Sequence, residues 1–174
     1  MGLACREATR RLDIDRIKGI SVDTTACSVV ALDNNFKPLR KSLLWMDTRS
    51  SPETDLILQS GRGDPALNVN CDGEGPLSAE WMLPKSLWIK RNEPEIWNNA
   101  QFICEKQDYL NLKLTGRYCA SGCNVAARWH WNAEEACSLD RTGDGSGDRH
   151  RGRPVRLLHK IGLSDILEKW PKGE

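Results

Sequence analysis

The feature that most constrains this fold is a short apolar run, SVVAL at residues 28–32, which polar turn residues close at both ends. The triplet Asp-Thr-Thr (23–25) precedes the run and Asp-Asn-Asn (33–35) follows it. An apolar run of this length between turn signals predicts a buried strand, because a helix needs a longer segment. Residues 17–33 as a whole are therefore expected to be β structure, and residues 39–46 are expected to form the next strand of a hairpin.

Helix signals alternate with these strands along the chain. The predicted helices begin near serine, proline or acidic residues, which are favoured at helix N-termini, and Pro84 is expected to kink or interrupt the second of them. Strands that alternate with helices indicate an α/β domain. The predicted elements are helices at residues 51–59, from Ser78, from Pro94 and at 108–115, and a strand at 101–104.

Two segments differ in composition from this pattern. Residues 1–16 are highly charged and are expected to form an N-terminal helix. Residues 138–156 (SLDRTGDGSGDRHRGRPVR) are rich in glycine, arginine and aspartate, so we expect an irregular insertion there. An amphipathic pattern resumes over residues 157–174, and the body of the domain is expected at residues 17–137.

Charge and hydropathy exclude several classes of protein. Lys and Arg number 25 and Asp and Glu number 24, so the net charge of +1 gives no general attraction for nucleic acid or for an anionic membrane. No apolar run reaches the roughly 18–20 residues that span a bilayer. The charged N-terminus lacks the pattern of a secretory signal, so we expect a cytoplasmic protein. The seven cysteines are then expected to stay reduced, and no pair of them has the spacing of a zinc site.

Two clusters of polar residues could bind a small ligand. The turn at residues 23–28 carries a carboxylate and hydroxyl groups, which could hold a polyol or a phosphate or could simply close the turn. In the second cluster, Asp47 and Arg49 lie on the same side of an extended segment, next to Trp45. They could grip a sugar beside the indole ring, or form a surface ion pair. Asp108 stands where a helix N-cap is expected.

Five segments, in this order, resemble the N-terminal domain of the FGGY-family carbohydrate kinases, and in particular the ribulokinase-like, pentulose-specific branch. The segments are ISVDTTACSVVALD, LLWMDTRS, GPLSAEWMLPKSLWIKRNEPEIW, ICEKQDYLNLKLTGR and CASGCNVAARWHWN. The resemblance covers residues 17–131 and again 157–171. It implies an α/β fold of the actin-like (ribonuclease-H-like) ATPase type, here incomplete. It also implies a reaction in which the γ-phosphate of ATP, bound with Mg²⁺, is moved to a sugar hydroxyl between two such domains.

The resemblance implies roles for particular residues as well. The DTTACS turn matches a sugar-contacting loop of the family, and WMDTRS matches its W-x-D-x-R block, which holds the sugar. The helix that follows these two blocks carries Lys85, which matches a residue at the edge of the family's sugar pocket. Asp108 matches a position that is mainly structural. The implied sugar-binding residues are Thr25, Ala26, Cys27, Trp45, Asp47, Arg49 and Lys85.

Two parts of the family's machinery have no counterpart in these segments. They are the D-x-G-T turn that grips the phosphates of ATP and the aspartate that acts as general base. We therefore expect no catalytic, ATP-binding or metal-binding residue in this chain and little activity from it alone.

The implied function is ATP-dependent phosphorylation of a ketopentose such as D-ribulose. The alternatives are a non-catalytic fragment that binds a sugar or a partner, and an adaptor acting through residues 140–153. An exposed sheet edge would also favour a homo-oligomer.

Overall fold

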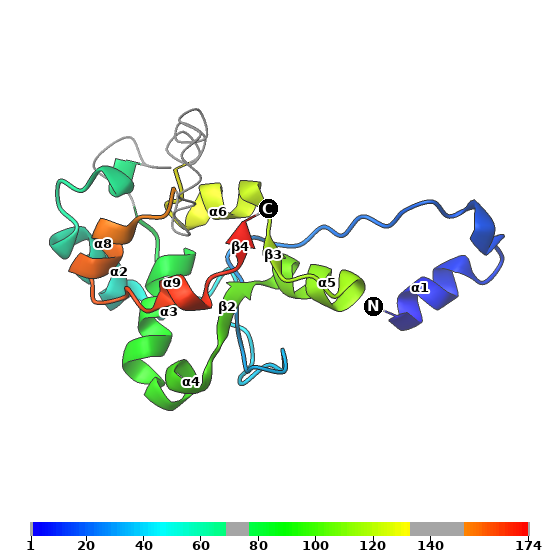
Figure 1. Cartoon of the computed structure of the whole chain (residues 1–174), viewed down its shortest axis with the longest axis horizontal. Coiled ribbons are helices and arrows are strands. Elements are labelled where there is room, and N and C mark those ends of the chain that lie inside the picture. The colour runs from blue at the N-terminus through cyan, green and yellow to red at the C-terminus, as the bar shows by residue number, and fades with distance from the viewer. Residues whose placement is uncertain (1, 69–76, 133–151, 174) are drawn as a thin grey trace, which may run out of the picture.

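A computed structural model of the 174-residue chain describes residues 2–68, 77–132 and 152–173. A two-stranded antiparallel sheet lies within the helical body, and an N-terminal arm extends away from it (Figure 1). The described elements are α1 (Gly2–Thr9), η1 (Ile14–Arg16), β1 (Val29–Leu32), α2 (Ser51–Ser60), η2 (Pro65–Asn68), α3 (Met82–Asn92), α4 (Pro94–Asn99), β2 (Phe102–Glu105), α5 (Lys106–Thr115), β3 (Cys119–Ala120), α6 (Gly122–Arg128), α8 (Val155–Lys160), α9 (Ile166–Lys169) and β4 (Lys172–Gly173).

β1 is the strand predicted from the SVVAL run, and the structure confirms it. It pairs antiparallel with β2, with Val29 opposite Glu105. Its other edge meets the following chain only at two isolated bridges, which involve Leu43 and Pro38. The prediction of a continuous strand at residues 39–46 was therefore wrong. Pro38 has no backbone N–H, so it cannot extend a ladder of hydrogen bonds on that edge.

Residues 17–26 were expected to be β structure, but they run as an extended arm from η1 towards β1 (Figure 1). In the parts of the chain that the structure describes, no strand pairs with this segment, and Ile20 is 70% exposed. A β-strand is defined by backbone hydrogen bonds to a neighbouring strand. The apolar residues of this segment alternate as in a strand, but no strand lies alongside, so the segment is extended and unpaired. The charged N-terminal stretch does form a helix, α1, which has no buried residue.

Two expectations about helices need correction. Pro84 does not interrupt α3, because it lies in the first turn, where a backbone N–H has no intrahelical acceptor and the proline ring removes no hydrogen bond. Asp108 is not the N-cap of α5. Glu105 is the N-cap, and Asp108 completes a capping box by accepting the Glu105 N–H at 3.1 Å. At its other end α5 stops at Gly116 in the left-handed region (φ 74), as the sequence predicted.

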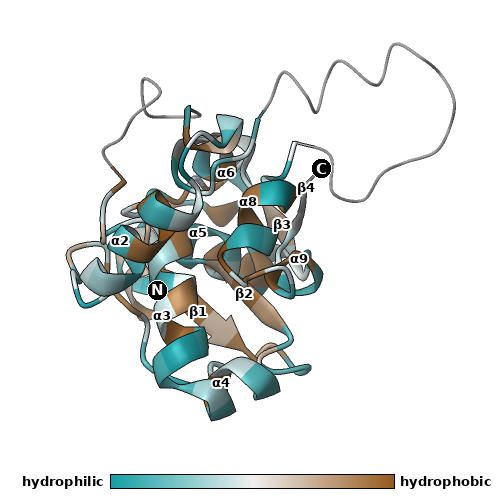
Figure 2. Ribbon diagram, turned by 90° about the vertical axis from the view of Figure 1, so that its left-hand side faces the viewer, coloured by the Kyte–Doolittle hydropathy of each residue, from teal (hydrophilic) through white to brown (hydrophobic). Residues whose placement is uncertain are grey.

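The two faces of β1 are buried in two different apolar clusters. Val29 and Ala31 belong to the larger one, which α3, α8 and α9 cover. Val30 and Leu32 belong to a smaller cluster, together with Leu112 of α5. Figure 2 shows apolar residues along β1 and β2 beneath more polar helices. A strand covered on both faces has no polar side, which is why its sequence reads as an uninterrupted apolar run.

The C-terminal helices are joined to α3 and α4 by polar contacts. Asp165, just before α9, accepts the indole N–H of Trp97 and forms an ion pair with Lys90, both at 2.7 Å. The irregular insertion expected at residues 138–156 lies outside the described residues apart from 152–156. Among the helices that the structure describes, none combines the length and the apolar character needed to cross a membrane.

Candidate functional site

The turn at residues 25–27 connects the extended arm to β1 and contains a strained backbone. Thr25 and Ala26 are exposed, whereas Cys27 is 5% exposed. Cys27 has a φ of 65°, in the left-handed region that residues with a side chain rarely adopt. Such a conformation costs roughly 1–2 kcal/mol, so other contacts must hold it in place. Burial raises the pKa of the Cys27 thiol to about 11, with a further contribution from nearby Glu105, so the group stays a neutral thiol.

Lys85, in the first turns of α3, is completely buried and donates hydrogen bonds only to backbone carbonyls. Its Nζ atom lies 3.0 Å from the Cys27 carbonyl, 2.6 Å from that of Leu44 and 3.0 Å from that of Trp45. Burial lowers the pKa of this ammonium group. The family resemblance implies a position for Lys85 at the edge of the sugar pocket; in the structure its side chain is buried in the protein interior and joins the turn to the segment that carries Trp45.

Asp47 and Arg49 form the second part of the site. The Arg49 Nε–H donates to both carboxylate oxygens of Asp47, at 2.9 and 3.0 Å, and the guanidinium lies over the ring of Trp88 at 4.9 Å. The bond from Arg49 holds the pKa of Asp47 below its ordinary value, and the same bond raises the pKa of Arg49. The backbone N–H of Asp47 donates to the Leu44 carbonyl, which also accepts from Lys85. This ion pair is therefore held next to the buried lysine.

The structure brings the two predicted clusters to the same place through Lys85. The turn presents Thr25 and Ala26 to solvent, and the second segment presents Trp45, which is 43% exposed, and the Asp47–Arg49 pair. An indole face, a carboxylate and a guanidinium are the groups with which proteins bind polyhydroxylated ligands. Of the seven predicted residues, Cys27 and Lys85 are buried, and the other five are accessible or half-buried.

Sequence reasoning missed Glu105. This N-cap residue of α5 is fully buried, and its carboxylate accepts the Cys27 N–H at 3.2 Å and the indole N–H of Trp129 at 3.2 Å. Burial raises the pKa of Glu105 to about 7 in spite of these two bonds, and raises that of Asp108 to about 6. The E-x-x-D spacing at the start of α5 is that of a capping box, but its residues differ from the usual Ser or Thr followed by Glu or Gln, so the sequence signal is weak.

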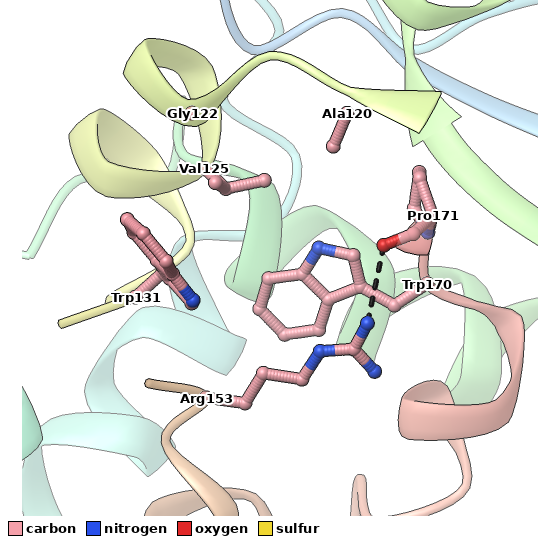
Figure 3. A pocket seen from close by; sticks show the side chains of 7 residues that line it. All are labelled: Ala120, Gly122, Val125, Trp131, Arg153, Trp170 and Pro171. Atoms are coloured by element: carbon pink, nitrogen blue, oxygen red, sulfur yellow. Dashed lines mark hydrogen bonds between the residues drawn. The ribbon is translucent and has the colours of Figure 1, made fainter. Parts of the chain in front are cut away.

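A separate small cavity lies between α6 and the C-terminal segment (Figure 3). Its volume of about 70 Å³ is enough for a few water molecules. The Arg153 guanidinium donates to the carbonyls of Leu167 and Pro171 at 3.0 and 3.1 Å, so it serves to fix the chain there. The lining residues are Ala120, Gly122, Val125, Trp131, Arg153, Trp170 and Pro171. None of them belongs to the predicted sugar-binding set.

The side chains that the structure describes form no site that fits Mg²⁺. Within these ranges no three His, Cys, Asp or Glu side chains gather in a group that could hold a metal ion. Two of the carboxylates near the turn are already engaged, Asp47 by Arg49 and Glu105 by backbone and indole N–H groups. Because Mg²⁺ is usually held by carboxylate oxygens and phosphates, we assign none of the described residues to it.

Comparison with known proteins identifies the family. A model of the N-terminal domain of the FGGY family of carbohydrate kinases matches residues 3–135, a span that includes the arm. An FGGY carbohydrate kinase domain-containing protein of Homo sapiens is 31% identical over 146 residues, covering 76% of this chain and 25% of that protein. A xylulose kinase of Staphylococcus epidermidis is 36% identical over 122 residues, covering 70% of this chain and 21% of that protein. This chain thus spans about a quarter of the length of these relatives.

Solved structures agree with this assignment. A xylulose kinase from Brucella ovis is 25% identical and superposes with a TM-score of 0.71 over 99% of this chain and 31% of its own. A ligand-bound xylulose kinase from Lactobacillus acidophilus, 17% identical, superposes with a TM-score of 0.64 over 96% of this chain and 36% of its own, and supports the fold alone. The expected actin-like α/β fold is confirmed. The chain therefore belongs to the FGGY family of carbohydrate kinases and covers part of its N-terminal domain.

Proposed function

We propose that this chain supplies sugar-binding residues for the ATP-dependent phosphorylation of a ketopentose. The observation that carries the proposal is the position of Lys85, whose ammonium group joins the turn at Cys27 to the segment of Trp45. Two stretches that lie apart in the sequence thereby form one surface. Relatives named xylulose kinase and ribulokinase support a pentulose as the sugar.

Each accessible group of this surface has a chemical task in the proposal. Asp47 is ionised at neutral pH, since Arg49 lowers its pKa, so its remaining lone pairs accept hydrogen bonds from sugar hydroxyls. Arg49 fixes the direction of that carboxylate and donates to a sugar oxygen. The exposed ring of Trp45 covers an apolar C–H face of the sugar, and the Thr25 hydroxyl contributes a further donor and acceptor.

Phosphoryl transfer itself depends on positioning and on the stabilisation of phosphate charge. In the proposal these residues contribute the positioning of the sugar, and they contribute no group that handles phosphate. The sugar hydroxyls are oriented by Asp47 and Arg49, while the buried thiol of Cys27 remains protonated and takes no part in proton transfer.

The test is calorimetric titration of the purified chain with D-xylulose and D-ribulose, using ribitol as a control for nonspecific polyol binding. We expect saturable binding of at least one pentulose and weaker binding of ribitol. A parallel assay of ADP release with Mg-ATP separates a sugar-binding chain without activity from an active kinase. The absence of pentulose binding in a cooperatively folded sample would refute the proposal.

A further inference from the structure

We infer that Glu105 is a positioning residue for the sugar-contacting turn: together with Lys85 it holds Cys27 in its left-handed conformation and so fixes where Thr25 and Ala26 point. The inference rests on the proposed function, because it concerns the same surface. It assigns a role to a residue that contacts neither sugar nor phosphate in that proposal.

Glu105 is itself held in one orientation. One carboxylate oxygen accepts the Cys27 N–H at 3.2 Å, and the other accepts the Trp129 indole N–H at 3.2 Å. Trp129 is completely buried and packs against Trp170 with ring centroids 4.4 Å apart. The carboxylate therefore cannot rotate without losing a buried hydrogen bond, which costs roughly 1–3 kcal/mol.

The side chains of Glu105 and Lys85 bind the two backbone polar groups of Cys27. Glu105 accepts the N–H of Cys27, and Lys85 donates to its carbonyl at 3.0 Å. Without them, Cys27 would gain by returning to a negative φ, which is the ordinary region for a residue with a side chain. A change of φ at Cys27 swings the preceding residues, Thr25 and Ala26, relative to Trp45 and Asp47, because the chain pivots at that bond.

Burial, and after it the charged surroundings, make the hydrogen bonds of Glu105 sensitive to pH, because they set the pKa of its carboxyl group. Asp108 of α5 opposes ionisation of Glu105, Arg128 of α6 favours it, and the Cys27 thiol and the Lys85 ammonium face the same site. An ionised carboxylate offers lone pairs on both oxygens, whereas a protonated one turns one oxygen into a donor. Both hydrogen bonds accepted by Glu105 are thus formed when its carboxylate is ionised, and its hold on the Cys27 N–H strengthens as pH rises through about 7.

The experiment compares the full chain with Glu105→Gln, in which an amide NH₂ replaces one acceptor oxygen and meets an N–H donor. Hydrogen exchange at the Cys27 amide reports the turn directly, and calorimetry reports pentulose affinity. We expect exchange at Cys27 to accelerate, and the affinity to fall, each by about tenfold, as for the loss of one buried hydrogen bond. Pentulose affinity of the wild type should also improve as pH rises through about 7, and that of the variant should not.

The matched control is Glu53→Gln, which alters another buried carboxylate. Glu53 pairs with Arg91 at 3.2 Å and has no bond to the turn. It should leave Cys27 exchange and pentulose affinity within about twofold of the wild type, because it removes no contact there. If Glu105→Gln changes the Cys27 amide no more than this control does, the positioning role is wrong.

A milder variant covers the case in which Glu105→Gln does not fold. Trp129→Phe keeps an aromatic ring against Trp170 but removes the indole N–H that orients Glu105. It should accelerate exchange at Cys27 by a smaller factor, and unchanged exchange would overturn the inference. If the wild type binds no pentulose, the proposed function fails, but the exchange measurements still decide whether Glu105 holds the turn.

Discussion

Lys85 and Glu105 bind the two backbone polar groups of Cys27, Lys85 its carbonyl and Glu105 its N–H, and the two side chains form no ion pair with each other in the structure. Both side chains are fully buried. Buried charges are expensive unless hydrogen bonds compensate them. In this domain the compensation comes largely from main-chain groups of the turn and of the segment at residues 44–45, so folding and the shape of the candidate site depend on the same few atoms.

Replacing Lys85 tests how far the stability of the fold depends on the hydrogen bonds that its ammonium group donates. Lys85→Met keeps the length of the side chain but removes the donor from the Cys27 and Trp45 carbonyls, and leaves the Leu44 carbonyl with the Asp47 N–H alone. We expect the free energy of unfolding to fall by about 2–4 kcal/mol, since unpaired buried acceptors are costly while removal of a buried charge offsets part of the loss. Urea denaturation followed by circular dichroism measures the change.

Lys113→Met is the control for that substitution. Lys113 also donates to a carbonyl, that of Phe36 at 3.2 Å, but this bond is exposed to solvent. Its loss should cost less than about 0.5 kcal/mol. Equal effects of the two substitutions would show that the buried contacts of Lys85 are not important for stability.

The raised pKa values of Glu105 and Asp108 predict how stability varies with pH. Both groups keep their protons in the folded chain at pH values where the unfolded chain has lost them, because folding raises their pKa from 4.5 to about 7 and from 3.8 to about 6. Their contribution to stability is complete below about pH 4 and is lost as pH rises towards 7. For Glu105 alone the loss is on the order of 3 kcal/mol.

Urea denaturation across this pH range measures the effect, and Glu105→Gln isolates the part due to one residue. Other groups, such as Asp47 and Asp165 with lowered pKa values, change stability in the opposite direction. Between about pH 4 and pH 7 the unfolding free energy of the wild type should therefore fall relative to that of the variant. A constant difference would contradict the raised pKa of Glu105.

The left-handed backbone of Cys27 predicts an inversion of the usual order of two substitutions. Cys27→Ala and Cys27→Gly both remove the buried thiol, but only glycine adopts a φ of 65° without steric cost. The glycine variant should be more stable than the alanine variant by about 1 kcal/mol, whereas in ordinary strands and helices alanine is favoured. Thermal melts of the two proteins provide the comparison. A more stable alanine variant would show that the turn relaxes when the thiol is removed.

The parts of the fold that sequence predicted depend on residues close together in the chain. The SVVAL run and its flanking turns predicted β1, and Gly116 predicted the end of α5. The unpaired state of residues 17–26 could not be predicted in this way, because it depends on whether another strand lies alongside. Pro84 was misjudged because the start of α3 was placed too early, at Ser78 instead of after Trp81.

In the candidate site, too, the sequence predicted a contact between residues close together in the chain but not the contacts between distant ones. Asp47 and Arg49 were identified as a pair from their spacing, and the structure shows them bonded to each other. The environment of Lys85 could not be anticipated, because its partners are backbone carbonyls, which leave no trace in the sequence. Glu105 did carry a weak local signal, the capping box with Asp108, but its contact with Cys27 joins residues far apart in the chain.

Arg49 allows sugar binding to be separated from stability. Arg49→Lys keeps the positive charge but loses the paired contact with Asp47 and the packing on Trp88. Because the side chain is exposed, the free energy of unfolding should change by less than about 1 kcal/mol. Pentulose affinity should fall by about tenfold, since the Asp47 carboxylate is no longer held in one direction.

Arg91→Lys, which alters an equally exposed arginine paired with Glu53, is the control and should leave affinity unchanged. Calorimetry on both variants decides: similar losses of affinity would mean that Arg49 has no particular role in the proposed sugar site.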